Sequence, residues 1–550
     1  MSDGKLFDYE RFFPYSSVRG DQATAIEFIL DQFINHKKKY VICEAGTGVG
    51  KSAIGLTVAR YLHSLTIGSP NQTNSRFEVG SYFLTTQKIL QDQYTNDFGP
   101  PNGPMRSIKS SSNYGCSFHK TNTCCESQAL VKTEEQGSKF WNNCVTNCVY
   151  KNEKKRFISS SESVTNFSYF LTETAYAKKI KPRTCLVLDE SHNIESEMSR
   201  FIEISISEHF AKQVLKLDMP EISTQYQAVQ WINNIYLPKI KSHIKHIDDM
   251  FENDIELKKK VEEMAKLSRQ IDLLRGHLSK IETFARVYHN DNWVFNLLDE
   301  EGKSKRKLEF KAIDISAFAD QYLFSFGEKI LMMSATILNH KAFCDSLGID
   351  VNKSAFITLQ SPFPIENRPI LSVSVGKMSK NNIDDTLPKI VDAIKMILEE
   401  HKNEKGIIHC HSYFIANYIK KHVKSKRLLL HDSTDRDEIL KKHIASNQPT
   451  VLLSPSMTEG VDLHGDLSRF QVVCKVPYPY LGDKICKKRM TKWKWWYPLM
   501  TAKTIVQCVG RSIRSETDHA VTYILDSDWE DFYKRNTEMF PKGFRDSLTS

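Results

Sequence analysis

"EAGTGVGKS" (residues 44–52) is the stretch that decides the fold of this chain. The apolar run "KYVICEA" (39–45) predicts a short buried strand before it, and the pattern over 51–64 predicts a helix after it. A glycine-rich loop between a strand and a helix, ending in Lys51 and Ser52, is typical of a phosphate-binding P-loop. We therefore expect backbone N–H groups of this loop to cradle nucleotide phosphates, with Lys51 adding a positive charge and the Ser52 hydroxyl binding Mg²⁺. The residues expected to surround the phosphates are Ala45, Gly46, Thr47, Gly48, Val49, Gly50, Lys51 and Ser52.

A second motif supplies the chemistry of hydrolysis. "TCLVLDESHN" (184–193) is an apolar strand that ends in Asp189 and Glu190. An aspartate in this position can hold Mg²⁺, and a glutamate can polarise the attacking water. Such a pair is common by itself, but together with a P-loop about 140 residues upstream it indicates a site that hydrolyses nucleoside triphosphates. Near the end of the chain, Arg511 and Arg514 are candidates for neutralising charge on the transferred phosphoryl group.

The organisation of the chain is that of an α/β protein with two insertions. Its 550 residues suggest three to four domains. Apolar strands alternate with helices, which favours parallel sheets, and the alternation is interrupted twice. Residues 99–155 are polar and rich in cysteine, whereas strand signals fade from about 206 to 318. In the second interruption, apolar residues at three- and four-residue spacing predict one long amphipathic helix: Leu257, Val261, Met264, Leu267, Ile271, Leu274, Leu278 and Ile281.

Composition excludes several classes of protein. Hydrophobic residues make up 40% and charged residues 26%, which excludes a wholly disordered chain. The net charge of +9 suits a polyanionic partner without requiring one. No apolar run is long enough to span a membrane, and "MSDGKLFDYERFF" at the start lacks the features of a signal peptide. We therefore expect an intracellular protein, cytoplasmic in a bacterium or virus and nuclear in a eukaryote, whose cysteines do not form disulfides.

The ordered motifs resemble those of superfamily 2 helicases, and within them the iron–sulfur XPD/DinG-like group. The phrases that carry this resemblance are "RGDQATAIEF", "EAGTGVGKS", "LTTQKILQDQY", "SSSNYGC", "SVTNFSYFL", "DESH", "SATI", "SPF", "TEGVDL", "KVPYP" and "QCVGRSIR". The resemblance implies two RecA-like P-loop motor domains, the first carrying a cysteine-rich iron–sulfur insert and a helical arch. The implied boundaries are 1–205 for the first motor domain with the insert at 99–157, 206–318 for the arch, and 319–550 for the second motor domain.

The resemblance also implies roles for individual residues. Gln22 would read the adenine edge with Arg19 nearby, and Ser334 and Thr336 would couple hydrolysis to the grip on DNA. The box of the family reads Asp-Glu-Ser-His here, with Ser191 where alanine is usual. The implied catalytic residues are Lys51, Asp189, Glu190, His192, Gln507, Arg511 and Arg514, and Gly460 and Asp462 would line the nucleotide cleft.

Five of the twelve cysteines lie within 33 residues, in a segment too polar to form a core: Cys116, Cys124, Cys125, Cys144 and Cys148. Soft thiolates at this density are typical of a metal site. The resemblance implies a [4Fe–4S] cluster held by Cys116, Cys144, Cys148 and one of Cys124 or Cys125. Structural zinc and loose thiols are the alternatives.

The resulting hypothesis is an ATP-dependent DNA helicase, a monomeric motor of the kind found in DNA repair and replication, that uses ATP and Mg²⁺. By resemblance it would move 5′ to 3′ on single-stranded DNA and open forked duplexes. The alternatives are a translocase or a remodeller of RNA–DNA hybrids or proteins with little unwinding, and an ATP-switched nucleic-acid-binding scaffold. Lys88, Gln91 and the basic run Lys151, Lys154, Lys155 and Arg156 are candidate phosphate contacts, and "KKRMTKWKWWYP" (487–498) could stack bases but is favoured as a packing segment.

Overall fold

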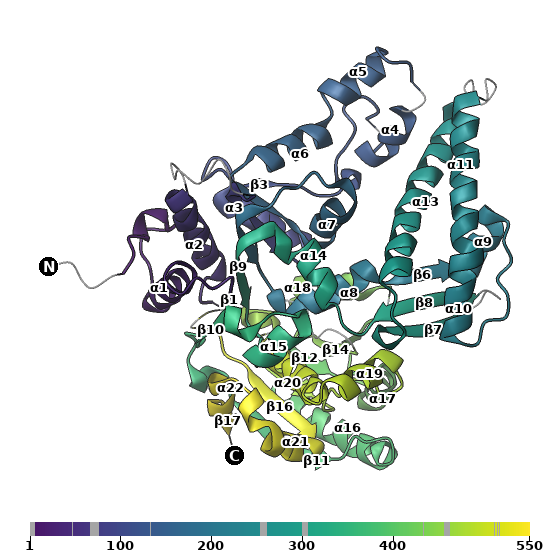
Figure 1. Cartoon of the computed structure of the whole chain (residues 1–550). Helices are drawn as coiled ribbons and strands as arrows, with labels where there is room; N and C mark the ends of the chain where they lie inside the picture. The colour runs from purple at the N-terminus through teal and green to yellow at the C-terminus, as the bar shows by residue number, and fades with distance from the viewer. Residues whose placement is uncertain are drawn as a thin grey trace.

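A computed structural model of the chain shows two parallel sheets covered by helices, with two insertions that project from the first (Figure 1). The structure describes residues 6–46, 48–66, 76–120, 122–131, 134–253, 261–299, 306–432, 434–455, 463–510, 512–513, 515 and 517–549. All statements below concern these residues.

The first sheet has seven strands and contains the predicted P-loop strand near one edge. Its strands, in spatial order, are β10 (Ser354–Leu359), β1 (Tyr40–Ala45), β9 (Gly327–Ser334), β5 (Arg183–Leu188), β2 (Glu78–Thr85), β4 (Glu162–Asn166) and β3 (Arg106–Ser107). All neighbours are parallel, and every residue of β1 and β5 is buried, as expected for central strands covered on both faces. Helices α1 (Gly20–Ile34), α2 (Lys51–Thr66) and α3 (Lys88–Phe98) belong to this domain.

The boundary expected at residue 319 is wrong, because the first sheet takes its last two strands from beyond it. β9 and β10 lie on either side of β1, with Tyr40 opposite both Ile330 and Ser354. The first α/β unit therefore extends to Leu359, and the second begins with β11 (Ile370–Gly376). These pairings join residues about 300 positions apart, and no local pattern in the sequence reveals them.

The second sheet is also seven-stranded and parallel. Its strands, in spatial order, are β13 (Leu428–Leu430), β14 (Val451–Ser454), β12 (Gly406–His409), β15 (Phe470–Val473), β16 (Val521–Asp526), β11 (Ile370–Gly376) and β17 (Leu548–Thr549). Helices α16 (Ile383–Glu400), α17 (Tyr413–Val423) and α20 (Trp496–Val509) are among those that follow its strands. The α/β fold class with two parallel-sheet domains is thereby confirmed.

The two interruptions form the two projections in Figure 1. The cysteine-rich segment contains α4 (Cys124–Val131), α5 (Lys139–Thr146) and α6 (Val149–Ser159). The second interruption contains α9 (Glu208–Leu215), α10 (Gln225–Trp231), α11 (Leu237–Asn253) and α13 (Val261–Val287). The predicted amphipathic helix corresponds to α13, although Leu257 lies outside the described residues.

The second interruption also holds a small antiparallel sheet that we did not expect, with the order β6 (Ile204–Ser207), β8 (Arg306–Ala312) and β7 (Trp293–Asp299). A signal for it exists in "RKLEFKA", where buried Leu308, Phe310 and Ala312 alternate with charged residues. Within the described part of the chain, no helix combines the length and the apolar character needed to cross a membrane.

Candidate nucleotide-binding site

The glycine loop has the geometry of a phosphate cradle. β1 leads into it and α2 begins at Lys51, as predicted. Gly48 and Gly50 have φ values of +85° and +87°, which favour glycine. A Cβ atom on Gly48 would lie 2.3 Å from the Phe363 ring, and one on Gly50 would lie 2.5 Å from Gln22 Nε2. Glycine is therefore required at both positions; Thr47 lies outside the described residues.

Arg19 and Gln22 hold this loop from the start of α1. Arg19 Nη2 donates to the carbonyl oxygens of Gly48 and Val49 at 2.8 and 2.7 Å, and Gln22 Nε2 donates to Val49 O at 2.9 Å. The two side chains expected beside the adenine thus bind the P-loop backbone here. Their contact with adenine stays a prediction.

Asp189, which is expected to hold Mg²⁺ with Ser52, is hydrogen-bonded by a residue that sequence reasoning missed. Tyr94 of α3 is 3% exposed, and its hydroxyl donates to Asp189 Oδ2 at 3.1 Å. Asp189 Oδ1 accepts from the backbone N–H of Glu190 at 3.0 Å. Burial, followed by the charge of Glu190, raises the pKa of Asp189 to about 6. A carboxylate and a hydroxyl are oxygen ligands that suit Mg²⁺, so the donors present fit this ion.

Glu190 and His192 lie in a strained turn that follows β5. Glu190 has the left-handed backbone angles φ 49° and ψ 44°, which are uncommon outside glycine and cluster at functional sites. His192 Nδ1 lies 3.3 Å from Glu190 Oε2 and 2.7 Å from Ser334 Oγ at the end of β9. His192 thereby connects the Asp-Glu-Ser-His motif to the "SATI" segment.

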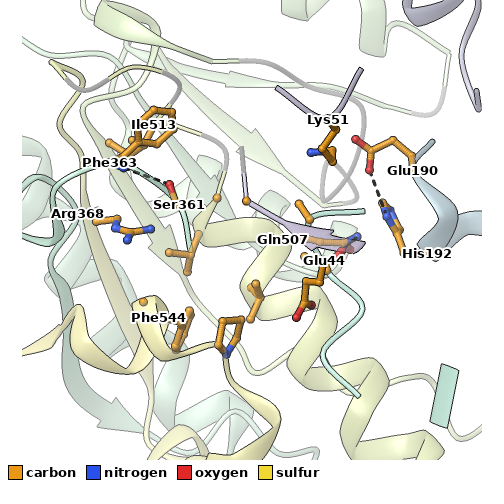
Figure 2. Close-up of a pocket in the computed structure, with 18 of the residues that line it drawn as sticks. Glu44, Lys51, Glu190, His192, Ser361, Phe363, Arg368, Gln507, Ile513 and Phe544 are labelled. Carbon is orange, nitrogen blue, oxygen red and sulfur yellow. Dashed lines mark hydrogen bonds and ion pairs between the residues drawn. The ribbon is translucent and has the colours of Figure 1, made fainter. Parts of the chain in front are cut away.

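The second domain closes the other side of the site. Gln507 Nε2 donates to Thr336 Oγ1 at 3.3 Å, and Lys503 Nζ donates to His192 O at 2.8 Å. A cavity of about 870 Å³ lies between the domains and is lined by Lys51 and Glu190 from the first and Gln507 from the second (Figure 2). This volume is within the range of small-molecule sites.

Glu44 is a second lining residue that sequence reasoning missed. It is 6% exposed at the end of β1, and its Oε1 accepts from the backbone N–H groups of Ile337 and Leu338, both at 2.7 Å. Burial raises the pKa of this carboxyl group, and the two N–H groups oppose that shift. Glu44 therefore fixes the chain that follows "SATI" against the P-loop strand.

Four further predicted residues, Gly460, Asp462, Arg511 and Arg514, lie outside the described residues. Between the two arginines, Ile513 is described, and it lines the cavity and packs with Phe363. The roles of Gly460, Asp462 and the two arginines stay predictions.

The cysteine-rich segment brings two of its five thiols into contact. Cys124 Sγ lies 3.4 Å from Cys148 Sγ, and Cys124, Cys144 and Cys148 are buried. Burial, and then the neighbouring thiols of Cys148, Cys144 and Cys116, raise the pKa of Cys124 to about 12. Cys125 is exposed.

The donor chemistry of these four thiols fits a soft metal centre. Among the described residues, however, no three His, Cys, Asp or Glu side chains are grouped closely enough to hold a metal ion. No cysteine among the described residues forms a disulfide.

Several candidate nucleic-acid contacts are engaged within the protein. Gln91 is 0% exposed and hydrogen-bonds the backbone of Ile108, so the expectation that it contacts DNA is wrong. Lys88 Nζ donates to Asn113 Oδ1 at 2.8 Å, and Lys154 Nζ pairs with Glu173 at 2.5 Å.

The basic aromatic segment 487–498 also packs. Arg489 Nη1 pairs with Glu195 of the first α/β unit at 2.7 Å, Lys492 pairs with Asp314, and Trp496 is buried. These contacts support the packing interpretation of this segment over base stacking.

Comparison with known proteins gives matches to both halves of the chain. Residues 16–219 match the family described as type III restriction enzyme, res subunit, and residues 395–547 match the helicase C-terminal domain. A probable ATP-dependent helicase of Methanocaldococcus jannaschii is 24% identical over 63% of this chain and 56% of its own length. The ATP-dependent DNA helicase DinG of Photobacterium profundum is 26% identical over 42% of this chain and 36% of its own length. The chain thus spans about half, or less, of the curated relatives it matches.

Solved structures share the fold. A structure titled XPD helicase has a TM-score of 0.62 at 16% identity and covers 96% of this chain and 98% of its own. The structure of Xpd4 from S. tokodaii has a TM-score of 0.57 at 14% identity, covering 97% and 100%. Together with the sequence matches, these findings confirm the resemblance to XPD/DinG-like superfamily 2 helicases.

Proposed function

We propose that this chain is an ATP-dependent DNA helicase that moves 5′ to 3′ along a single strand and unwinds duplex DNA. The observation that carries the proposal is the cavity between the two α/β domains, because the P-loop residues Gly46 and Lys51 line it with Glu190 on one side and Gln507 lines it on the other. A nucleotide bound there contacts both domains, so its hydrolysis changes how tightly they close.

The residues in and beside the cavity have separate roles in hydrolysis. Lys51 Nζ, which donates to Ala45 O at 3.3 Å, turns to the phosphates when ATP binds. Ser52 and Asp189 hold Mg²⁺, which neutralises phosphate charge when bound. Glu190 orients the attacking water, and its contact with His192 keeps the carboxylate at the cavity edge.

Hydrolysis reaches the second domain through the contacts that cross the cavity. Gln507 binds Thr336 and Lys503 binds His192 O, so both bonds change when the domains close or open. Arg511 and Arg514 are proposed to approach the transferred phosphoryl group from the same side. Alternate closing and opening moves the chain along one strand, with contacts to phosphates that are largely independent of sequence.

We further propose that Cys116, Cys124, Cys144 and Cys148 hold a [4Fe–4S] cluster. The 3.4 Å contact of Cys124 Sγ with Cys148 Sγ supports this set, and the exposure of Cys125 argues against it as the fourth ligand. Zinc is the alternative occupant of four thiolates. The visible absorption of an iron–sulfur protein separates the two, because zinc is colourless.

Unwinding assays with anaerobically purified protein test the function. We expect ATP-driven opening of a duplex with a 5′ single-stranded tail and no opening with a 3′ tail. Lys51→Ala should abolish turnover and leave single-strand binding intact, whereas Lys181→Ala, an exposed lysine of the same domain, should behave as wild type. Normal turnover by Lys51→Ala would refute the site. Stimulation of ATP hydrolysis by DNA without opening of either duplex would replace the helicase with a translocase or hybrid remodeller.

A further inference from the structure

Helix α3 contacts Asp189, at the proposed metal end of the nucleotide site, through Tyr94. The Tyr94 hydroxyl donates to Asp189 Oδ2 at 3.1 Å. Burial, followed by the charge of Asp189, raises the pKa of Tyr94 well above its ordinary value. One buried phenol therefore contacts a carboxylate that is proposed to hold Mg²⁺.

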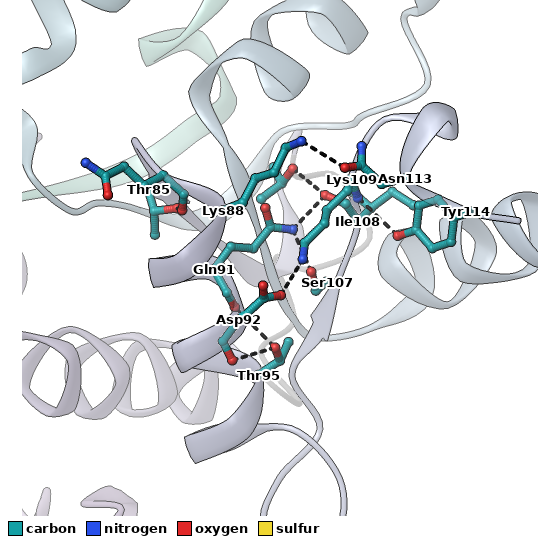
Figure 3. Close-up of polar contacts among 12 residues, drawn as sticks. Thr85, Lys88, Gln91, Asp92, Thr95, Ser107, Ile108, Lys109, Asn113 and Tyr114 are labelled. Atoms are coloured by element: carbon teal, nitrogen blue, oxygen red, sulfur yellow. Dashed lines mark hydrogen bonds and ion pairs between the residues drawn. The ribbon is translucent and has the colours of Figure 1, made fainter. Parts of the chain in front are cut away.

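Helix α3 also holds the segment 106–114, which leads into the cysteine-rich insert, through Gln91 and Lys88 (Figure 3). Gln91 Nε2 donates to Ser107 Oγ at 2.5 Å and to Ile108 O at 2.8 Å. One turn earlier, Lys88 Nζ donates to Asn113 Oδ1 at 2.8 Å. Because Gln91 and Tyr94 are three residues apart on one helix, a displacement of Tyr94 displaces Gln91 with it.

Segment 106–114 ends at the thiols. The Tyr114 hydroxyl accepts from Lys109 N at 3.1 Å, which closes the segment on itself. Tyr114 O accepts from Cys124 N at 2.7 Å, and Cys116 follows two residues later. A continuous series of contacts thus runs from Asp189, through α3, to the cysteine-rich insert.

We propose that Tyr94 is a positioning residue for Asp189 and that, through α3, it links occupation of the metal position to the conformation of segment 106–114. The hydroxyl fixes Oδ2 while the Glu190 N–H fixes Oδ1, so the carboxylate has one orientation before the metal arrives. If the Asp189 carboxylate moves when it binds Mg²⁺, Tyr94 moves with it and displaces α3. Gln91 then displaces segment 106–114 through its hydrogen bonds with Ser107 and Ile108. The proposal rests on the proposed function, because it needs the cavity to bind Mg²⁺ and ATP.

The test uses the full chain, Mg²⁺ and the non-hydrolysable analogue AMP-PNP. Hydrogen exchange of peptides covering 106–116 should change in the wild type when both are added. Tyr94→Phe should lose this change, and it should need about tenfold more Mg²⁺ for half-maximal analogue binding, the effect of one hydrogen bond to a charged group. Gln91→Met should lose the exchange response while keeping the wild-type Mg²⁺ requirement, because it cuts the series beyond Tyr94.

Tyr82→Phe is the matched control. Tyr82 is 1% exposed in the same domain, and its hydroxyl donates to Lys181 O at 3.1 Å, away from the metal end. This variant should behave as wild type, and an equal loss in it would assign the effect to core packing and overturn the proposal. The proposal would also be overturned if Tyr94→Phe needed no more Mg²⁺ than the wild type and kept the wild-type change in hydrogen exchange. A wild-type protein that binds no AMP-PNP would instead refute the proposed function.

Discussion

Replacing Glu44 by alanine should destabilise the first α/β unit much more than replacing it by glutamine. Glu44 Oε1 accepts two backbone N–H groups at 2.7 Å, from Ile337, which is 4% exposed, and from half-buried Leu338. Alanine leaves both donors without this acceptor, and an unsatisfied buried donor costs about 1–3 kcal/mol. Glutamine keeps an acceptor oxygen and removes a buried charge.

The magnitude follows from the burial of the two donors. Loss of the acceptor for the buried Ile337 N–H should cost near the upper end of that range, and loss of the acceptor for the half-buried Leu338 N–H near the lower end. Removal of the buried carboxylate charge offsets part of this destabilisation. We expect a net loss of about 3 kcal/mol for Glu44→Ala and less than about 1 kcal/mol for Glu44→Gln. In a unit of this size, 3 kcal/mol lowers Tm by about 6–12 °C.

Differential scanning calorimetry of the full chain measures the first unfolding transition of each variant. Glu78→Ala is the control, because Glu78 begins a strand of the same sheet but is half exposed and forms a surface ion pair with Lys181. Its Tm should stay within about 2 °C of wild type. Equal Tm values for the alanine and glutamine variants of Glu44 would show that the two hydrogen bonds do not hold this part of the fold.

Three further changes have defined outcomes. Cys124→Ser should remove iron and visible absorption from anaerobically purified protein, whereas Cys125→Ser should keep both; the reverse result would exchange their roles. Burial lowers the pKa of His63 from 6.5 to about 4, so the unfolded chain binds more protons between these values and stability falls as pH decreases through them, by up to about 3 kcal/mol. His63→Gln should flatten the dependence of Tm on pH in this window, and an unchanged slope would exclude His63 as a cause. Arg60→Leu leaves the buried Glu162 carboxylate without its partner and should cost about 3–5 kcal/mol in denaturant unfolding, most of it regained when Glu162 is also replaced by leucine.

The parts of the site that lie in one continuous stretch were predictable from sequence. The strand before the P-loop, the helix from Lys51 and the carboxylates after β5 follow from local apolar patterns and glycine spacing. The proximity of Gln507 to this site was implied by family resemblance, and the structure places it at the cavity.

The parts that depend on distant contacts were not predictable. Tyr94 looks like any core tyrosine of an amphipathic helix, and its contact with Asp189 joins residues 95 positions apart. Glu44 contacts residues almost 300 positions away, so its sequence context gives no hint of the two N–H groups it accepts. Gln91 was misinterpreted for the same reason, because the segment that buries it returns from the beginning of an insert.

The position of β1 between β9 and β10 has a consequence for synthesis of the protein. β1 leaves the ribosome early, yet both strands that hydrogen-bond to it come about 300 residues later. At 5–20 residues per second, this strand waits about 15–60 s for its neighbours. Throughout that time, "YVICEA" is an apolar segment with an unpaired backbone, which is a target for chaperones and a starting point for aggregation. Slow translation or a truncation before residue 354 should therefore be harmful to the first α/β unit even though its P-loop has already been made.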